Sequence, residues 1–201
     1  GRDSVGRFLI SESKKAGFDD LNIQLDDERN TTLAFVALND GERDFSFYRN
    51  PGADMMLRVE EIDEELIANS EVFHFGSLSM THPEVFEATV KALHIAKEKG
   101  CLITYDPNLR PPLWDSMELA RERIGFGMQW CDVMKISDNE LQWFTGKEDF
   151  DEGISALRER YSVPLILLSM GKDGSRAYYK NMRVEAQAFL RSDTVEATGA
   201  G

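Results

Sequence analysis

The sequence is poor in cysteine and in positive charge, and each shortage excludes a class of protein. Cys101 and Cys131 are the only cysteines, and they lie in apolar stretches without a CxxC motif. This pattern indicates reduced core thiols rather than a disulfide framework or a metal site. Lys and Arg number 23 against 36 Asp and Glu, so the basic cluster that nucleic-acid binding requires is missing.

Further missing motifs limit the types of reaction that the protein could catalyse and its location in the cell. No apolar run reaches membrane-spanning length, and no signal peptide is visible, so we expect a cytoplasmic protein without a membrane partner. No GxGxxG motif follows a predicted strand, which excludes a nicotinamide-binding Rossmann protein. The order Ser-His-Asp and metal-ligand spacings are also missing. His74, in an apolar strand, and His94, in a helix, are interpreted as structural, and His82, in the loop before a helix, as a cap or surface residue.

The two ends of the chain look like the interior of a domain. "GRDSVGRFL" at the start is typical of a chain already within its fold. The closing "EATGAG" is typical of a turn that opens a helix, although nothing follows Gly201. We therefore expect both ends to be truncated.

The first quarter of the chain predicts a helix followed by a β-hairpin. Val5, Phe8 and Leu9 recur at helical spacing, which predicts a helix over about residues 4–16. Asn39-Asp40-Gly41 separates two runs rich in β-branched and aromatic residues, which predicts antiparallel strands within about residues 31–49.

From residue 60 onward, short apolar strands alternate with amphipathic helices. This alternation predicts a doubly wound α/β fold, in which buried parallel strands carry helices on both faces. A stretch "VEEIDEELIAN" predicts one helix before the first strand, and "SRAYYK" and "RVEAQAFL" predict antiparallel strands at an edge of the sheet. The predicted parallel strands are "VFHFG", "CLITYD", "DVMKIS" and "PLILLSM".

Polar or glycine residues follow each of these four strands. Ligands of open α/β sheets bind beyond the carboxyl ends of the strands, so these residues are candidates for one shared site. They are Gly76 and Ser77, Asp106 to Arg110, Ser137, Asp138 and Glu140, and Ser169, Gly171, Lys172 and Gly174.

Each candidate also has a structural interpretation. Arg110 suits bidentate phosphate recognition in a loop stiffened by three prolines, yet an arginine there is equally typical of a solvated surface. Glu140 either complements the dipole of the following helix or orients water around Mg²⁺. Gly171 and Gly174 fit a simple hairpin turn as well as a close approach to a nucleotide. Their joint position at one sheet edge favours the site.

Five motifs occur along the chain, namely "GRDSVGRFL", "YDPNLRPPLW", "DVMKISDNELQWFTG", "LLSMGKDG" and "EATGAG". Together they resemble the ribokinase-like (PfkB) carbohydrate kinases, in the order of that family and over nearly the whole chain. Within the family, "TTLAFVALNDGERDFSFYRNPGAD" is similar to fructokinases. The resemblance implies a ribokinase-like α/β sandwich with a mainly parallel central sheet flanked by helices. Residues 1–201 would form part of one kinase domain, with a β lid at about 31–49.

The resemblance also implies an ATP- and Mg²⁺-dependent sugar kinase that forms fructose 6-phosphate, and it assigns roles to residues. Glu140 would organise Mg²⁺ through water, although Ser137 stands where the family motif Asn-x-x-Glu has Asn. Arg110 would contact phosphate. Arg49, Tyr48 and Asn108 would bind substrate, and Gly199, Ala200 and Gly201 would form an anion hole. Nucleotide-binding residues would be Ser137, Ser169, Gly171 and Gly174.

In the family, an Asp follows the Gly-Ala-Gly and acts as general base. This chain stops before that position, so we expect these 201 residues alone to be inactive. Three alternatives remain open: a 2-keto-3-deoxygluconate kinase, a kinase for another sugar, and an inactive regulatory relative. The apolar lid residues Phe35, Phe45 and Phe47 also suggest a homodimer.

Overall fold

The structure is a computed structural model that describes residues 1–18, 22–39 and 42–189. The sequence-predicted turn of Gly199, Ala200 and Gly201 lies outside the described residues, as does the predicted Asp40-Gly41 tip of the hairpin. The predictions for these residues therefore stay predictions.

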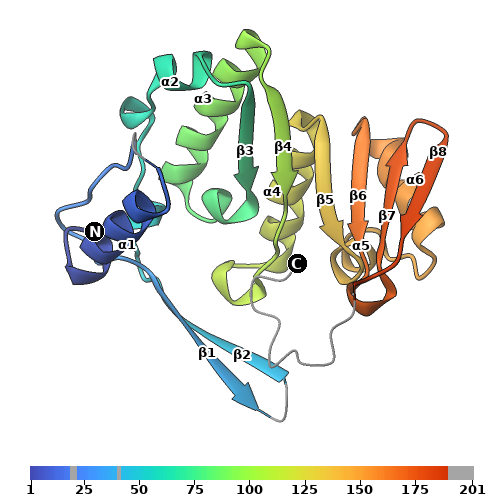
Figure 1. Ribbon diagram of the computed structural model, residues 1–201, viewed down its shortest axis with the longest axis horizontal. Helices are drawn as coiled ribbons and strands as arrows, with labels where there is room; N and C mark the ends of the chain where they lie inside the picture. The colour runs from blue at the N-terminus through green and yellow to red at the C-terminus, as the bar shows by residue number, and fades with distance from the viewer. Residues whose placement is uncertain (19–21, 40–41, 190–201) are drawn as a thin grey trace.

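The N-terminal region contains a helix and a hairpin, as predicted. Helix α1 (Ser4–Lys15) begins at Asp3, whose carboxylate accepts a hydrogen bond from the Gly6 amide at 2.8 Å. Strands β1 (Leu33–Asn39) and β2 (Glu42–Tyr48) pair antiparallel. The hairpin projects away from the rest of the molecule, on the side towards which the parallel strands of the main sheet point (Figure 1).

The main sheet has six strands in the order β3-β4-β5-β6-β7-β8, which is also their order in the chain. The pairs from β3 to β6 are parallel, and β7 and β8 add antiparallel at the edge, as predicted. The strand bounds are β3 Val72–Gly76, β4 Leu102–Asp106, β5 Val133–Ser137, β6 Leu165–Ser169, β7 Ser175–Tyr179 and β8 Met182–Ala186.

The helices between the strands begin and end at signals that are local in the sequence. Helix α3 (Pro83–Lys99) starts with its proline and ends at Gly100, whose φ of 76° is the left-handed conformation that glycine adopts without strain. Side-chain caps begin the next three helices. These are α4 (Met117–Trp130) after Ser116, α5 (Asp138–Thr145) after Ser137 and α6 (Phe150–Arg160) after Asp149.

Two predictions about helices are wrong. The stretch "VEEIDEELIAN" is divided into a 3₁₀ turn (Val59–Glu61) and a short helix α2 (Glu64–Ala68). The division occurs because Asp63 accepts a hydrogen bond from the Leu66 amide and so starts a new helix.

The second error concerns the faces of the sheet. Helices were expected on both faces, but in the described part of the chain α3, α4, α5 and α6 cover one face only (Figure 1). Right-handed crossovers between strands that stay in chain order place every helix on the same side. Exposure agrees with this arrangement, since Ile103, Met134 and Ile166 are fully buried whereas Val72 and Leu102, on the other face, are 51% and 45% exposed.

The core lies between the sheet and these helices. It is almost wholly apolar, and Tyr105, 1% exposed, is its largest fully buried side chain. The ring of Tyr105 stacks on Phe75 with centroids 4.4 Å apart. A β-carbon at position 127 would collide with this ring, so Gly127 gives α4 its close approach to the sheet. None of the helices in the described ranges has both the length and the apolar character that crossing a membrane requires.

Candidate active site

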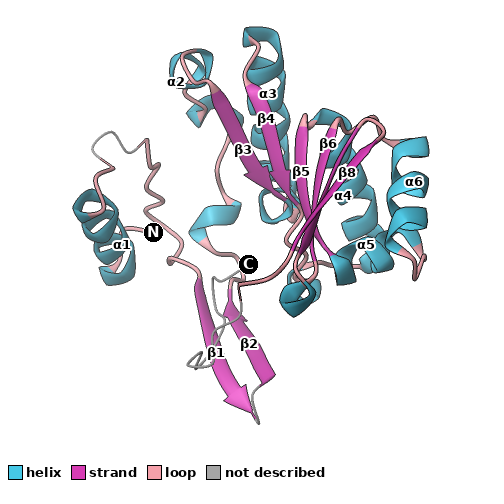
Figure 2. Ribbon diagram, turned by 45° about the vertical axis from the view of Figure 1, so that its right-hand side comes forward, coloured by secondary structure: helices cyan, strands magenta, loops and turns pink. Residues whose placement is uncertain are grey.

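The predicted site residues after the four parallel strands do gather at one edge. Strands β3, β4, β5 and β6 end at Gly76, Asp106, Ser137 and Ser169. Gly76 is aligned with Asp106, and Ser137 with Ser169. Because parallel strands point the same way, these four ends form a polar row along one edge of the sheet. The β1–β2 hairpin lies on the same side of the molecule (Figure 2).

Glu140 joins two of the loops at this edge. Its Oε2 accepts hydrogen bonds from the Ser137 amide at 2.9 Å and from the Ser137 hydroxyl at 2.7 Å. Its Oε1 accepts from the Leu109 amide, in the loop after β4, at 2.6 Å. Ser137 in turn caps α5 by accepting from the Glu140 amide at 3.3 Å, which completes a capping box. Ser137 and Asn are both favoured at this cap position, which explains how Ser can stand where the family motif has Asn.

Arg110 lies in the loop that Glu140 holds, next to the hairpin. Its Nη1 donates to the Leu109 carbonyl oxygen at 3.0 Å, and its guanidinium lies 5.7 Å from the ring centroid of Phe45 in β2. This cation–π contact connects the predicted phosphate-binding arginine to the hairpin. Asn108, two residues before Arg110, is exposed and has a φ of 46°, a left-handed conformation that Asn tolerates better than most residues.

Asp106 at the end of β4 carries unused hydrogen-bonding capacity. Its Oδ2 lies 3.3 Å from the Lys135 ammonium nitrogen, whereas its Oδ1 is buried without a partner among the described residues. The fully buried Ser77 hydroxyl, which follows β3, also has no partner within the described ranges. Buried polar atoms are normally paired, so this edge has capacity to bind a polar ligand.

The turn after β6 contains the predicted glycines. Gly171 has a φ of 55° and is exposed, and Gly174 has a φ of 92°. A β-carbon at position 174 would collide with the Ala186 carbonyl oxygen of the neighbouring strand. The close packing of the β6–β7 turn therefore explains why position 174 is a glycine. At Gly171, in contrast, a β-carbon would meet no neighbouring atom, so the space beside Ser169 at the edge is open.

The two hairpin residues predicted to bind substrate differ in exposure. Tyr48 is 67% exposed, and its ring meets Phe35 edge-on at 5.4 Å. Only 5% of the Arg49 side chain is exposed, and its guanidinium is bound by groups of the protein itself. Its Nη1 donates to the Thr81 hydroxyl at 2.8 Å. The structure thus brings Arg49 to the edge without leaving it open to solvent.

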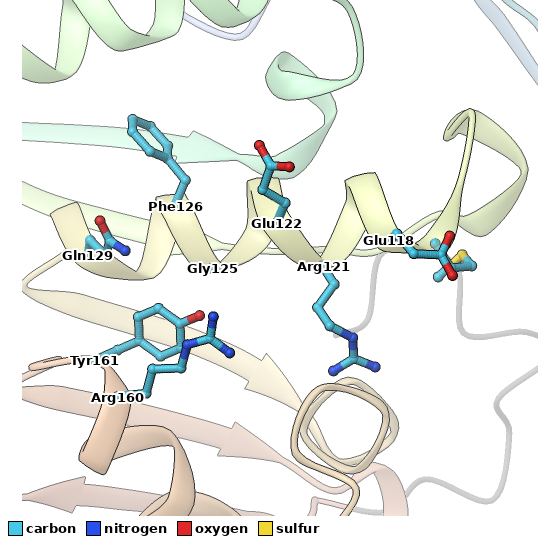
Figure 3. A pocket seen from close by; sticks show the side chains of 9 residues that line it. Glu118, Arg121, Glu122, Gly125, Phe126, Gln129, Arg160 and Tyr161 are labelled. Atoms are coloured by element: carbon cyan, nitrogen blue, oxygen red, sulfur yellow. The ribbon is translucent and has the colours of Figure 1, made fainter.

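The helical layer contains a separate groove of about 570 Å³ between α4 and the end of α6 (Figure 3). Arg121 on its wall donates to the carbonyl oxygens of Trp143, at 2.8 Å, and Phe144, and so caps the C-terminal end of α5. Glu118, Glu122 and Arg160 give the groove mixed charge. The predicted site residues that the structure describes do not line this groove.

Neither cysteines nor a preformed metal cage contribute to the site in the described residues. Burial raises the pKa of the Cys131 thiol to about 12, so it stays protonated and unreactive near neutral pH. Within the described ranges, no three His, Cys, Asp or Glu residues cluster as metal ligands.

Three residues at this edge were not predicted from the sequence: Lys135, Asp54 and Thr81. Lys135 had a visible signal, because a lysine within the apolar strand "DVMKIS" has no reason to face a core. Asp54 and Thr81 had none, since they meet Arg49 only through the folding of distant segments.

The described residues combine a mainly parallel α/β sheet, a polar row at its carboxyl edge, and Arg110 between that row and the hairpin. They define an α/β protein of the class that binds its ligands beyond the carboxyl ends of the strands. Residues 1–201 match the family model described as pfkB family carbohydrate kinase. The chain belongs to this family, and it has the α/β fold with flanking helices that the resemblance implied.

Relatives of this chain include plant fructokinases. It is 42% identical to the probable fructokinase-2 of Arabidopsis thaliana over its whole length and covers 61% of that protein. It is 39% identical to fructokinase-1 of Zea mays, of which it covers 62%. The chain therefore spans about three fifths of the length of the relatives it matches.

Solved structures agree with this relationship. A Xylella fastidiosa fructokinase with bound ATP has a TM-score of 0.84 and 32% identity, over 94% of this chain and 60% of that one. A Vibrio cholerae O395 fructokinase with fructose, ADP and calcium ion has a TM-score of 0.89 and 26% identity, over 100% of this chain and 64% of that one.

Proposed function

We propose that the full-length protein transfers the γ-phosphoryl group of ATP to the 6-hydroxyl of D-fructose. The observation that carries the proposal is the polar row at the ends of β3 to β6, with Arg110 of that edge in contact with Phe45 of the hairpin. The similarity to fructokinases over the whole chain supports the choice of sugar. Buried free cysteines support a reducing, cytoplasmic location.

The residues at the edge fit a nucleotide with Mg²⁺. A carboxylate offers about four lone-pair positions, and Glu140 uses three of them for the Leu109 amide, the Ser137 amide and the Ser137 hydroxyl. One position remains, which suits a single water of a hydrated Mg²⁺ rather than direct coordination by several protein oxygens. Bound Mg²⁺ supplies neutralisation of phosphate charge.

The rest of the chemistry falls to groups of this chain. Arg110 is placed to pair with phosphoryl oxygens by its planar fork of donors. Ser169 and Gly171 form the side of the edge that would face the nucleotide. The hairpin would cover the sugar and exclude water, which favours transfer to the sugar over hydrolysis of ATP. The amides of Gly199 to Gly201 and the expected Asp beyond them would stabilise the transferred group and accept the sugar proton.

A keto-deoxy sugar acid fits the residues near the hairpin less well than a neutral hexose does. Its carboxylate needs cationic partners near the hairpin, and the guanidinium of Arg49 is already committed to Asp54, Thr81 and Leu78. A neutral hexose makes no such demand.

The hairpin also supports a homodimer. Phe35, Val36 and Tyr48 are 56%, 40% and 67% exposed on its strands, and clustered apolar exposure of this kind marks interaction surfaces. We expect a second copy to cover these residues. A monomer in light scattering of the full-length protein would contradict this expectation.

The test of the proposed function is ADP release by the full-length protein with Mg-ATP and a panel of sugars. The panel is D-fructose, D-glucose, D-ribose and 2-keto-3-deoxygluconate. We expect turnover with fructose. Turnover with the keto-acid alone would replace the substrate, and binding of ATP without turnover on any sugar would indicate an inactive regulatory relative.

A further inference from the structure

The base of the hairpin is fastened to the sheet by a group of polar contacts around Arg49. The Arg49 Nε donates to Asp54 Oδ2 at 2.7 Å, Nη1 donates to the Thr81 hydroxyl at 2.8 Å, and Nη2 donates to the Leu78 carbonyl oxygen at 3.1 Å. The other oxygen of Asp54 accepts from the Thr32 hydroxyl. We call Arg49, Asp54, Thr32 and Thr81 the hinge clasp.

The hinge clasp joins three segments that are separate in the chain. Thr32 lies immediately before β1, Arg49 immediately after β2, and Thr81 directly after the 3₁₀ turn (Ser77–Met80) that follows β3. Both strands of the hairpin are therefore tied to the carboxyl edge of the sheet through one guanidinium and one carboxylate.

The contacts leave Arg49 little capacity for a substrate. Each of its three guanidinium nitrogens has a protein partner, and its Nη2 also lies 2.6 Å from Asp54 Oδ2. Only 5% of the side chain is exposed, compared with 48% for Asp54. A sugar could reach the guanidinium only by displacing charge-assisted hydrogen bonds, which are among the strongest in proteins.

The orientation of the hairpin matters because its strand β2 contacts Arg110 at the carboxyl edge of the sheet. Phe45 of β2 lies against the Arg110 guanidinium, and Arg110 follows the amide that Glu140 holds. A rotation of the hairpin about its base would move Phe45 off Arg110. The clasp thus connects the angle of the hairpin to the surroundings of the predicted phosphate-binding arginine.

We propose that Arg49 is a positioning residue, which holds the hairpin at its working angle over the carboxyl edge through Asp54 and Thr81, and that it does not itself bind the sugar. This inference rests on the proposed function for its kinetic consequences. Its structural part concerns the hairpin alone.

The test compares Arg49→Gln, Asp54→Asn and the double variant in the full-length protein, with Arg58→Gln as the matched control. Arg58 is a nearby arginine whose side chain is 58% exposed and which pairs only with Glu60 and Glu61 in the described part of the chain. If the clasp acts as one unit, both single variants lower kcat/KM for fructose by a similar factor, about 10- to 100-fold. The double variant is then no worse than either single variant, because contacts within one network are not additive.

Two further readouts separate positioning from general damage. We expect the Arg49 and Asp54 variants to raise ATP hydrolysis in the absence of sugar, since a misplaced hairpin admits water. We also expect faster amide hydrogen exchange across residues 33–48 and unchanged exchange in β4 to β6. Arg58→Gln leaves all of these values unchanged.

A sugar-binding role for Arg49 gives a different result. Arg49→Gln would then raise KM for fructose, while Asp54→Asn left both kinetics and exchange at the values of the unsubstituted protein, and that outcome would overturn the proposal. If the unsubstituted protein does not phosphorylate fructose, the proposed function fails. Amide hydrogen exchange across residues 33–48 in the variants then still decides whether the hinge clasp holds the hairpin.

Discussion

The sheet and the hairpin are held in place by different forces. In the sheet, side chains such as Ile103, Met134 and Ile166 are fully buried under the helices. In the hairpin, Phe35 and Tyr48 remain more than half exposed. The hairpin depends instead on hydrogen bonds and ion pairs at its base, where Asp3 holds Thr31 and Arg49 holds Asp54.

From this difference we expect local opening to occur more readily in the hairpin than in the sheet. Apolar burial over many side chains stabilises the sheet as one cooperative unit. A few polar contacts fix a direction but contribute much less free energy. The residues predicted to bind nucleotide therefore lie on the stable part, and those predicted to enclose the sugar lie on the part that can open.

The largest expected effect comes from a cavity in the sheet. Leu168 in β6 is fully buried, so Leu168→Ala should lower the free energy of unfolding by about 2–5 kcal/mol. Val184→Ala on β8 is the control, because Val184 is 65% exposed and should cost no more than about 0.5 kcal/mol. Urea unfolding measures both. Similar losses for the two variants would contradict the one-sided core.

A smaller effect on stability and a large one on activity are expected at Glu140. Glu140→Ala removes half of the capping box and the acceptor of the Leu109 amide, which should cost about 1–2 kcal/mol of stability. It should also lower kcat of the full-length protein by about 100-fold, because a preorganised charge is lost. Asp149→Ala removes the cap of α6, where Asp149 accepts from the Glu152 amide at 2.9 Å, and should lower stability alone. Equal kcat losses would argue against a special role for Glu140.

Substitution of Arg121 tests the stability of the helical layer without changing a residue of the candidate active site. Arg121→Ala removes the donors to the Trp143 and Phe144 carbonyl oxygens and the contact with the Trp143 ring at 4.5 Å. We expect a loss of about 1 kcal/mol, the usual value for a cation at a helix C-terminus. Arg160→Ala in the same groove should change thermal stability much less. A kcat effect of Arg121→Ala beyond its stability loss would show that the two regions are coupled.

The smallest expected effect is an acid opening of the hairpin base. Hydrogen bonds from the Thr31 and Gly6 amides lower the pKa of Asp3 from 3.8 to about 2. A depressed pKa gives stabilisation that is present above pH 3.8 and is lost as the pH falls towards 2. The protection of the amides of residues 31–33, measured as their exchange rate relative to an unfolded chain at the same pH, should therefore fall between about pH 4 and pH 2, before that of the sheet. Asp3→Asn should remove this pH dependence, and an unchanged profile in that variant would assign the opening to another group.

Much of the fold could be predicted because its signals are local. The strands are short apolar runs, the helices begin at Ser116, Ser137 and Asp149, and each signal needs only neighbouring residues. The position of polar residues after four strands was enough to place Ser137, Glu140 and Ser169 at one edge.

The remaining features depend on contacts between distant segments. The sequence did not predict that Arg49 would meet Thr81, 32 positions along the chain. The expected cover on both faces of the sheet was wrong for the described residues, because alternation of strands and helices does not reveal strand order. The turn at Gly199 to Gly201 stays a prediction.

The most direct test of this account is amide hydrogen exchange of the full-length protein, with Mg-ADP alone, with D-fructose alone and with both. The account predicts that Mg-ADP protects residues 137–140 and 169–174, and that fructose protects the hairpin and residues 77–81. Protection should be greatest with both ligands. Protection of the groove between α4 and α6, with the carboxyl edge unchanged, would contradict the placement of the active site.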